Sequence, residues 1–350
     1  MSSRLRATGD GLQPEQQRRR APYYPLSPIP YRLRRVQRGV ALITAVLIVA
    51  LATILAVNVG FNGFLDQRRS ATRYALDQGF QVALGAEAWA ADTLRRDGVQ
   101  SAEQDDFTEE WATPIPPIPI EGGEVAGYLE DMQGRFNLNS LVISQGGGEF
   151  QPDLLAIRRF ERLLELLELE TKWAAFIADW IDTDEQAGFP DGAEDSVYTS
   201  ETPAYRTAEM PITRASELLA IAEFGLERYR KLEPYVTALP IGTRINLCTA
   251  SPELLDALVE GQTQFTAGRE TATDLRKERC HPTMDEFKSV LNDDQERELI
   301  QENVVDVTSD YFRSTVWVTI GTTQFTLYSL LYRADRTNLV RPILRSFGTT

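Results

Sequence analysis

The densest run of chemically capable side chains is an acidic loop between residues 179 and 195. It holds seven carboxylates, two glycines that let the chain turn, and no basic residue. Crowded carboxylates repel one another unless a hard cation lies among them, and Ca²⁺ takes about six to eight oxygen ligands. The loop therefore predicts a calcium site, with a solvated acidic surface as the alternative. Its carboxylates are Asp179, Asp182, Asp184, Glu185, Asp191, Glu194 and Asp195.

The spacing of these acids is not that of an EF-hand calcium loop. Asp182, Asp184 and Gln186 match the first three ligand positions of an EF-hand. The match then fails, because the glycine falls at place seven and Glu194 at place thirteen. We therefore expect calcium in a loop of another kind.

The sequence gives little support for an enzyme. His281 is the only histidine, and no G-x-S-x-G elbow, Walker loop or dinucleotide loop occurs. Paired carboxylates could serve glycoside hydrolysis, but here the acids crowd into one turn instead of facing one another across a cleft. We expect a protein that is not an enzyme.

The chain contains two cysteines, Cys248 and Cys280. Outside the cytoplasm an even pair favours a disulfide, which would stabilise the fold by roughly 3 to 4 kcal/mol in the chain-entropy model. Two buried free thiols are the alternative. A metal site with His281 is a third, poorer option, because two sulfurs and one imidazole make an incomplete ligand set.

A membrane segment precedes all of these groups. Val40 to Leu65 is apolar, with no charge between Arg38 and Asp66. A helix of this length spans roughly 39 Å, enough to cross a hydrocarbon core of about 30 Å with some tilt. Four arginines at positions 32, 34, 35 and 38 predict a cytoplasmic N-terminus and export of the residues after 65. A cleavable signal would usually have a shorter apolar region.

The same helix should continue beyond the membrane. No proline lies between Tyr31 and Thr113, so nothing breaks the helix for several turns. Apolar residues at helical spacing would give the extension a face on which a globular domain can pack. These residues are Leu76, Phe80, Ala83, Ala90 and Leu94.

The remainder of the chain predicts an α+β fold. Glu124–Leu138 reads as a strand and turn, and Ser314–Ile320 with Gln324–Tyr332 as two antiparallel strands around a glycine turn. Prolines between residues 114 and 119 predict an extended connector. Helical periodicity fills the region between the strands. Its predicted helices cover 153–169, 171–181, 215–224, 226–233, 252–259 and 284–302.

The net charge argues against nucleic acid as a partner. The chain carries −15 at pH 7, although its first 39 residues are rich in arginine. A helix-turn-helix pattern at 212–240 could bind DNA, but the acidic body would repel a duplex. We expect no nucleic acid and favour cations or basic proteins as partners.

The junction Arg38-Gly39-Val40 resembles the N-terminus of type IV pilins and of the pseudopilins of type II secretion. This resemblance implies that a prepilin peptidase cuts after Gly39 and methylates Val40, the first residue of the mature protein. Most members carry glutamate at the fifth mature position, where this chain has Thr44. That departure is typical of one family, type II secretion system protein K.

Two further stretches resemble the same family. Gly134-Arg135-Phe136-Asn137-Leu138-Asn139 matches its GRFNLN stretch, and residues 179–206 match its acidic segment. The resemblance implies calcium in the helical domain, because that family binds calcium there. It favours Asp182, Asp184, Glu194 and Asp195 as ligands, with Asp179 and Asp191 as further candidates.

The resemblance also implies an architecture, a place and a set of partners. We expect a pilin-like long helix packed on a small antiparallel sheet, with a large all-α domain inserted. The protein would be a minor pseudopilin at the tip of the periplasmic pseudopilus, with the minor pseudopilins I and J, anchored once in the inner membrane with its globular part in the periplasm. The expected parts are a leader at 1–39, the membrane helix at 40–65, a pilin-like domain at 66–140 and 303–335, the inserted domain at 141–302, and a tail at 336–350.

The sequence leaves two other classes of protein possible. A minor adhesin of a type IV pilus would share the N-terminal helix but lack the calcium segment. A membrane-anchored, calcium-dependent periplasmic hydrolase would need no cleavage at Gly39.

Overall fold

The computed structural model describes residues 38–100, 103–188, 190–259, 261, 263–334 and 339–348. The chain divides into two units, residues 1–65 and 66–350. Nearly all of the expected leader at 1–39 lies outside the described residues, as do parts of the expected tail.

One helix, α1 (Arg38–Gln100), runs for 63 residues. Its first part is the apolar segment predicted to span a membrane, and it alone, among the residues that the structure describes, is long and apolar enough to do so. The side chains from Val40 to Phe64 are mostly exposed. The uninterrupted helix follows from the absence of proline.

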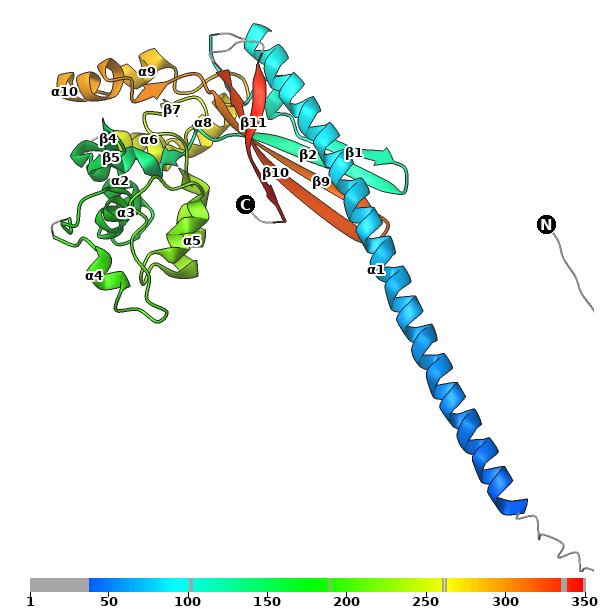
Figure 1. Cartoon of the computed structure of the whole chain (residues 1–350). Helices are drawn as coiled ribbons and strands as arrows, with labels where there is room; N and C mark the ends of the chain where they lie inside the picture. Colours follow the sequence, from blue (N-terminus) through cyan, green and yellow to red (C-terminus); the bar gives the residue numbers. More distant parts are fainter. Residues whose placement is uncertain are drawn as a thin grey trace, which may run out of the picture. The chain divides into compact units, whose positions relative to one another are not determined.

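A five-stranded antiparallel sheet in the order β1-β2-β9-β10-β11 forms the pilin-like part (Figure 1). Strand β2 (Gly123–Asp131) pairs with β9 (Tyr311–Ile320) along its whole length, although residues 132–310 separate them in the chain. Strand β10 (Thr323–Arg333) follows β9 across a tight hairpin. The expected sheet, interrupted by a long insertion, is confirmed.

The second part of α1 packs on this sheet (Figure 1). Small side chains on the helix let its backbone approach the strands closely: Ala83 is fully buried and Ala90 nearly so. Leu94 is fully buried between β9 and β10, beside Phe312 and Leu331. The predicted apolar face of the extension is therefore the face that contacts the sheet.

Both edges of the sheet differ from the prediction. The expected loose tail contains β11 (Val340–Phe347), which pairs with β10, and the expected proline connector contains β1 (Ile115–Ile120), which pairs with β2. Proline lacks a backbone N–H and therefore argues against a central strand, but an edge strand needs donors on one side only. In β11, half-buried and exposed side chains alternate. Pro342 and two arginines obscured this alternation in the sequence, so the strand was not predicted.

The inserted part is mainly helical and surrounds the largest apolar core of the chain. Trp173, Phe160 and Phe224 are among its fully buried side chains. Its longer helices are α2 (Leu154–Leu166), α3 (Trp173–Ile181), α5 (Gly225–Leu232), α6 (Pro252–Leu258) and α8 (Arg269–Leu275); the shorter ones are α4 (Asp195–Tyr198), α7 (Gln264–Ala267), α9 (Met284–Lys288) and α10 (Asp293–Glu296).

The expectation of an all-α insertion was wrong, because the insertion also contains strands: the short β6 (Val236–Thr237) and β7 (Ile245–Asn246), and a hairpin near its start. A hairpin of β4 (Val142–Gly146) and β5 (Glu149–Pro152) opens it. The three glycines at 146–148 all have positive φ, so they form the turn of a hairpin where the sequence indicated only a boundary.

The GRFNLN stretch joins the sheet to the helical part. A Cβ on Gly134 would collide with the Thr249 backbone. Phe136 stacks on Phe160 of α2. The Asn139 side chain donates to the carbonyls of Ile212 and Leu239, both at 2.8 Å. The motif is thus a structural joint between segments distant in sequence.

Candidate functional site

The acidic loop begins where α3 ends. The apolar face of α3 is buried, which fixes the orientation of the helix, and the backbone becomes extended at Asp182. Residues three apart lie on one face of a helix, so Asp179 and Asp182 lie close together. Glu194 returns to them as the residue immediately before α4.

Asp179 organises the loop. One of its oxygens accepts hydrogen bonds from the backbone N–H groups of Gly188 (3.0 Å) and Ala193 (2.7 Å). A Cβ on Gly192 would overlap both this carboxylate and the Gly188 backbone nitrogen. The loop therefore closes only with glycine at position 192, and the buried carboxylate holds both of its arms.

Asp179, Asp182 and Glu194 form the centre of the site. One oxygen from each lies within 4.8 Å of the others, and the three residues are 1%, 1% and 6% exposed. Both oxygens of Asp182 and Oε1 of Glu194 are buried without a hydrogen-bond partner. An unpaired buried carboxylate is costly, so this arrangement calls for a cation.

Burial disfavours the charged form of these acids. Burial and, to a smaller degree, neighbouring carboxylates together raise the pKa of Asp182 to about 7 and that of Glu194 to about 8. The pKa of Asp179 is also raised by burial, although its two backbone hydrogen bonds act against this. No basic group contributes to these shifts among the described residues.

The residues fit a hard divalent cation. All donors are carboxylate oxygens, which Ca²⁺ prefers, and the orphaned oxygens of Asp182 and Glu194 have no other partner in the described part of the chain. Three carboxylates offer fewer oxygens than the six to eight that Ca²⁺ typically takes. Backbone carbonyls and water would have to supply the remaining ligands.

The other three predicted ligands lie outside this group. Asp184 and Asp191 are exposed. Asp195 pairs with Arg206 at 3.0 Å and accepts a hydrogen bond from the Thr207 backbone N–H at 3.1 Å. Asp184 remains close enough for its charge to raise the pKa of all three central acids.

Sequence reasoning missed one nearby acid. Glu209 returns to the end of α3, where its backbone N–H donates to the Trp180 carbonyl at 3.2 Å. Its negative charge contributes to the raised pKa of Asp182. It lies beyond the acidic run, so composition alone gave no signal for it.

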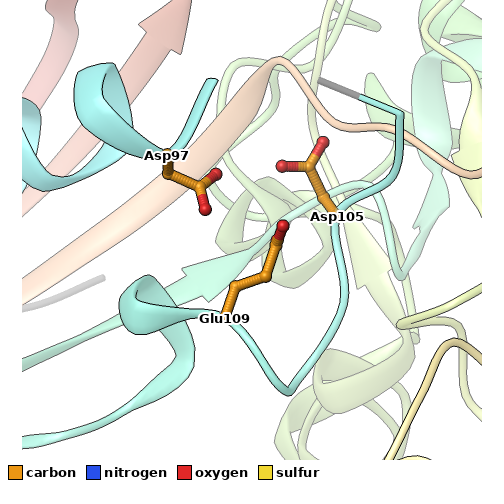
Figure 2. A group of neighbouring side chains, drawn as sticks. All are labelled: Asp97, Asp105 and Glu109. Carbon is orange, nitrogen blue, oxygen red and sulfur yellow. The ribbon is translucent and has the colours of Figure 1, made fainter. Parts of the chain in front are cut away.

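A second group of acids, also missed, lies between α1 and the sheet. Figure 2 shows Asp97, Asp105 and Glu109 pointing toward one another. This group contains a cation: Arg333 of β10 donates to Asp97 at 2.8 Å and to Asp105 at 2.5 Å. Burial still raises the pKa of Asp97 to about 6 and that of Glu109 to about 7.

The remaining predicted positions are a disulfide and a processing site. Cys248 and Cys280 form the predicted disulfide. Gly39 and Val40 lie in the first turn of α1, and residues 1–37 before them are outside the described part. The Thr44 hydroxyl donates to the carbonyls of Val40 and Ala41, so it is satisfied within its own helix.

Comparisons with known proteins agree on one family. A family model described as type II secretion system (T2SS), protein K matches residues 134–241. The type II secretion system protein K of Pseudomonas aeruginosa is 38% identical over 238 residues, which cover 65% of this chain and 70% of that protein. Its namesake from Aeromonas hydrophila is 30% identical over 319 residues, which cover 87% of this chain and 96% of that protein.

A solved structure shares the fold. One chain of the GspK–GspI–GspJ complex from the type 2 secretion system of enterotoxigenic Escherichia coli matches with a TM-score of 0.68 at 22% identity. The match covers 81% of this chain and all of that one.

Proposed function

We infer the role of this chain from the premise that it belongs to the family of type II secretion system protein K. It is accordingly a minor pseudopilin of that system. The similarity to the Aeromonas relative extends over nearly the whole of both proteins, and this single observation carries the assignment.

We propose that the chain occupies the tip of the pseudopilus, together with the minor pseudopilins I and J. Supporting this, a structural neighbour was solved as a complex of GspK with GspI and GspJ. A size argument adds to it: residues 132–310 lie between two paired strands, and an insertion of that bulk would be hard to place within a repeating shaft. The insertion would therefore block addition above this subunit and start the filament.

We propose a single-pass anchor in the inner membrane, with the N-terminus in the cytoplasm and the globular part in the periplasm. The support is one apolar N-terminal helix preceded by a cluster of arginines. Prepilin peptidase would cut between Gly39 and Val40. The proposed role is mechanical and not catalytic, as expected for a filament component.

We propose Ca²⁺ at Asp179, Asp182 and Glu194 as a structural element of the helical part. When bound, the ion would supply the positive charge that these buried carboxylates otherwise lack. Asp179 would then hold the two arms of the loop, while Asp182 and Glu194 supply oxygens that are already free of hydrogen bonds.

One experiment tests the assignment as a whole. A strain lacking this chain should lose secretion of type II cargo and keep its surface pili, and a tagged full-length copy should restore secretion. From detergent-solubilised membranes that copy should co-purify two other minor pseudopilins, and its N-terminal sequence should begin at Val40. Normal secretion with loss of surface pili would instead assign the chain to a type IV pilus.

A further inference from the structure

A pocket of about 210 Å³ lies in the helical part between α2 and the segment around α10. Three arginines of α2 line it, at positions 158, 159 and 162, and Gln295 and Glu298 face them. A volume of this size exceeds the roughly 30 Å³ that one water occupies in the liquid. Its lining residues include no member of either acidic cluster.

Gln295 lines this pocket and has a side-chain donor without a partner among the described residues. The residue is 7% exposed, and its Nε2 has no acceptor among the described residues. Its amide cannot simply be turned over. Oε1 accepts the backbone N–H of Asn292 at 3.1 Å, while the Asn292 side chain accepts the Gln295 backbone N–H at 2.9 Å. This capping box fixes the oxygen, so the nitrogen must donate elsewhere.

The arginines add positive charge to the same space. Arg159 is buried and pairs with Glu298 at 3.3 Å, and Arg162 donates to the backbone carbonyls of Asp256 and Val259. Arg158 makes one long hydrogen bond, from Nε to the Leu154 carbonyl at 3.4 Å, and no ion pair is seen for it within the described chain. Its terminal N–H groups are therefore available to a ligand.

We propose that this pocket binds an oxyanion, the carboxylate or phosphate group of a ligand, through Arg158 and Gln295. The carboxylates of Asp294 and Glu298 in the lining pair with Arg297 and Arg159. The groups left unpaired there among the described residues are the donors of Arg158 and Gln295, which favours an acceptor over a metal ion. A guanidinium fork matches the two oxygens of a carboxylate or phosphate. Three guanidinium groups against the carboxylates of Asp294 and Glu298 also make the lining net basic in a chain whose net charge is −15.

The test is calorimetric titration of the full chain in a neutral detergent. Inorganic phosphate and acetate are the two probes, each compared with chloride at equal ionic strength. Saturable binding of either supports the site. Tighter phosphate binding indicates a phosphate ligand, and tighter acetate binding indicates a carboxylate. Absence of saturable binding for both would overturn the proposal.

Two variants locate the binding. Gln295→Glu keeps the oxygen that accepts the Asn292 N–H but replaces the free donor by a second acceptor, so the capping box survives while an anion is repelled. Arg158→Gln removes an exposed guanidinium. Each should weaken the tighter probe by at least about tenfold, since a charge-assisted hydrogen bond contributes about 1.5 to 3 kcal/mol.

The matched control is Arg297→Gln. Arg297 pairs with Asp294 at the surface, with its own side chain 64% exposed, and does not line the pocket. Its loss should leave the affinity unchanged within about twofold, as for a screened surface charge. Equal losses in all three variants would show a general charge effect and overturn the assignment to Arg158 and Gln295. An unchanged melting temperature of Gln295→Glu shows that the fold is retained.

Discussion

Among the described residues, two largely buried acidic clusters are each built from two aspartates and one glutamate, and they differ in whether an arginine faces them. Asp97 and Asp105 face Arg333, which donates to both carboxylates. Asp179, Asp182 and Glu194 face no basic side chain within the described chain, and three of their oxygens have no partner. The first cluster contains its own cation, whereas the second would have to take one from solution, as we propose.

This difference corresponds to two roles. The cluster around Arg333 connects the end of α1 to β10, so its cation must be present whenever the domain is folded. The loop cluster lies within the helical part, where the proposed calcium ion would add stability if this part is periplasmic as we propose, at the millimolar calcium typical of extracellular modules. Variants of each cluster can show whether the source of the cation is the real distinction.

Replacing Arg333 by methionine should have the largest effect. The change strands Asp97 and Asp105 in a buried site, and removing one partner of a buried ion pair typically costs about 3 to 5 kcal/mol. Urea denaturation of the full chain in detergent, followed by tryptophan fluorescence, measures this free energy of unfolding.

The control is Arg69→Gln. Arg69 and Asp66 form a surface pair one helical turn apart, with side chains 68% and 74% exposed, and its loss should change the free energy of unfolding by less than about 0.5 kcal/mol. If Arg333→Met lost no more than this control, the first cluster would not depend on its arginine.

The second largest effect should come from calcium, which should stabilise the chain through the loop cluster and not through the cluster around Arg333. At a calcium concentration about 100 times its dissociation constant, binding stabilises the folded state by about 2.7 kcal/mol. We expect EDTA to lower the melting temperature of the wild-type chain and Ca²⁺ to restore it. Asp182→Asn should abolish the gain while leaving the chain at least as stable as the wild type in EDTA, because an unpaired buried carboxylate has been removed.

Asp105→Asn is the matched change in the other cluster. Asp105 accepts from Arg333 and from the Ser309 backbone N–H, so its replacement should destabilise the chain equally with and without calcium. If EDTA has no effect on the wild-type chain, the loop does not bind calcium.

The pH dependence of stability should show a smaller effect at Glu109. Its pKa of about 7 in the folded state, raised by burial from 4.5, means that the folded chain holds this proton more tightly than the unfolded one. The stabilisation of the folded chain by protonated Glu109 is fully present below about pH 4.5 and is lost as pH rises through 7. Glu109→Gln should therefore lose less stability between pH 5 and 8 than the wild type, by about 1 to 2 kcal/mol after allowance for partial exposure.

This measurement is made in EDTA, with urea titrations at each pH. Glu110→Gln, at the exposed neighbouring position, is the control and should follow the wild type. A wild-type stability that rises over this range, with no difference for Glu109→Gln, would contradict the assignment.

The exposed acids of the loop should have the smallest effects. Asp184→Asn removes a charge that acts on the three central acids, so it should weaken calcium binding by a few-fold through long-range attraction alone. Asp191→Asn should weaken it less. Calorimetry with CaCl₂ measures both, and a loss with Asp184→Asn as large as with Asp182→Asn would make Asp184 a direct ligand.

Much of the fold was predictable because it depends on local patterns. The length of α1 follows from a stretch without proline, and β9 and β10 from alternation around a glycine turn. The two edge strands were missed, since proline weakens the local signal for a strand and only pairing with β2 or β10 reveals it. The β4–β5 hairpin was missed because three glycines indicate a turn without indicating what the turn connects.

The sequence predicted a metal site in the acidic loop, but it did not predict which of the acids form the site. Crowding of acids within one loop signalled a cation, and Asp179, Asp182 and Glu194 were among the expected ligands. Which acids are buried depends on the path of the loop around Asp179 and Gly192, so the exposure of Asp184 and Asp191 had no local signature. The pairing of Asp97 and Asp105 with Arg333 had none either, because the arginine lies 236 and 228 residues from them in the chain.

The sequence by itself determined the apolar N-terminal helix, the α+β class, the acidic loop and, through its motifs, the family. Each of these depends on a pattern of residues that are neighbours in the chain. Only the tertiary structure decided which carboxylates share a buried space, which of them have an arginine, and where Gln295 is left without an acceptor. The physical reason is that burial and pairing depend on groups brought together from distant parts of the chain, and the charge of a buried carboxylate is stable only if such a partner, or an ion, is at hand.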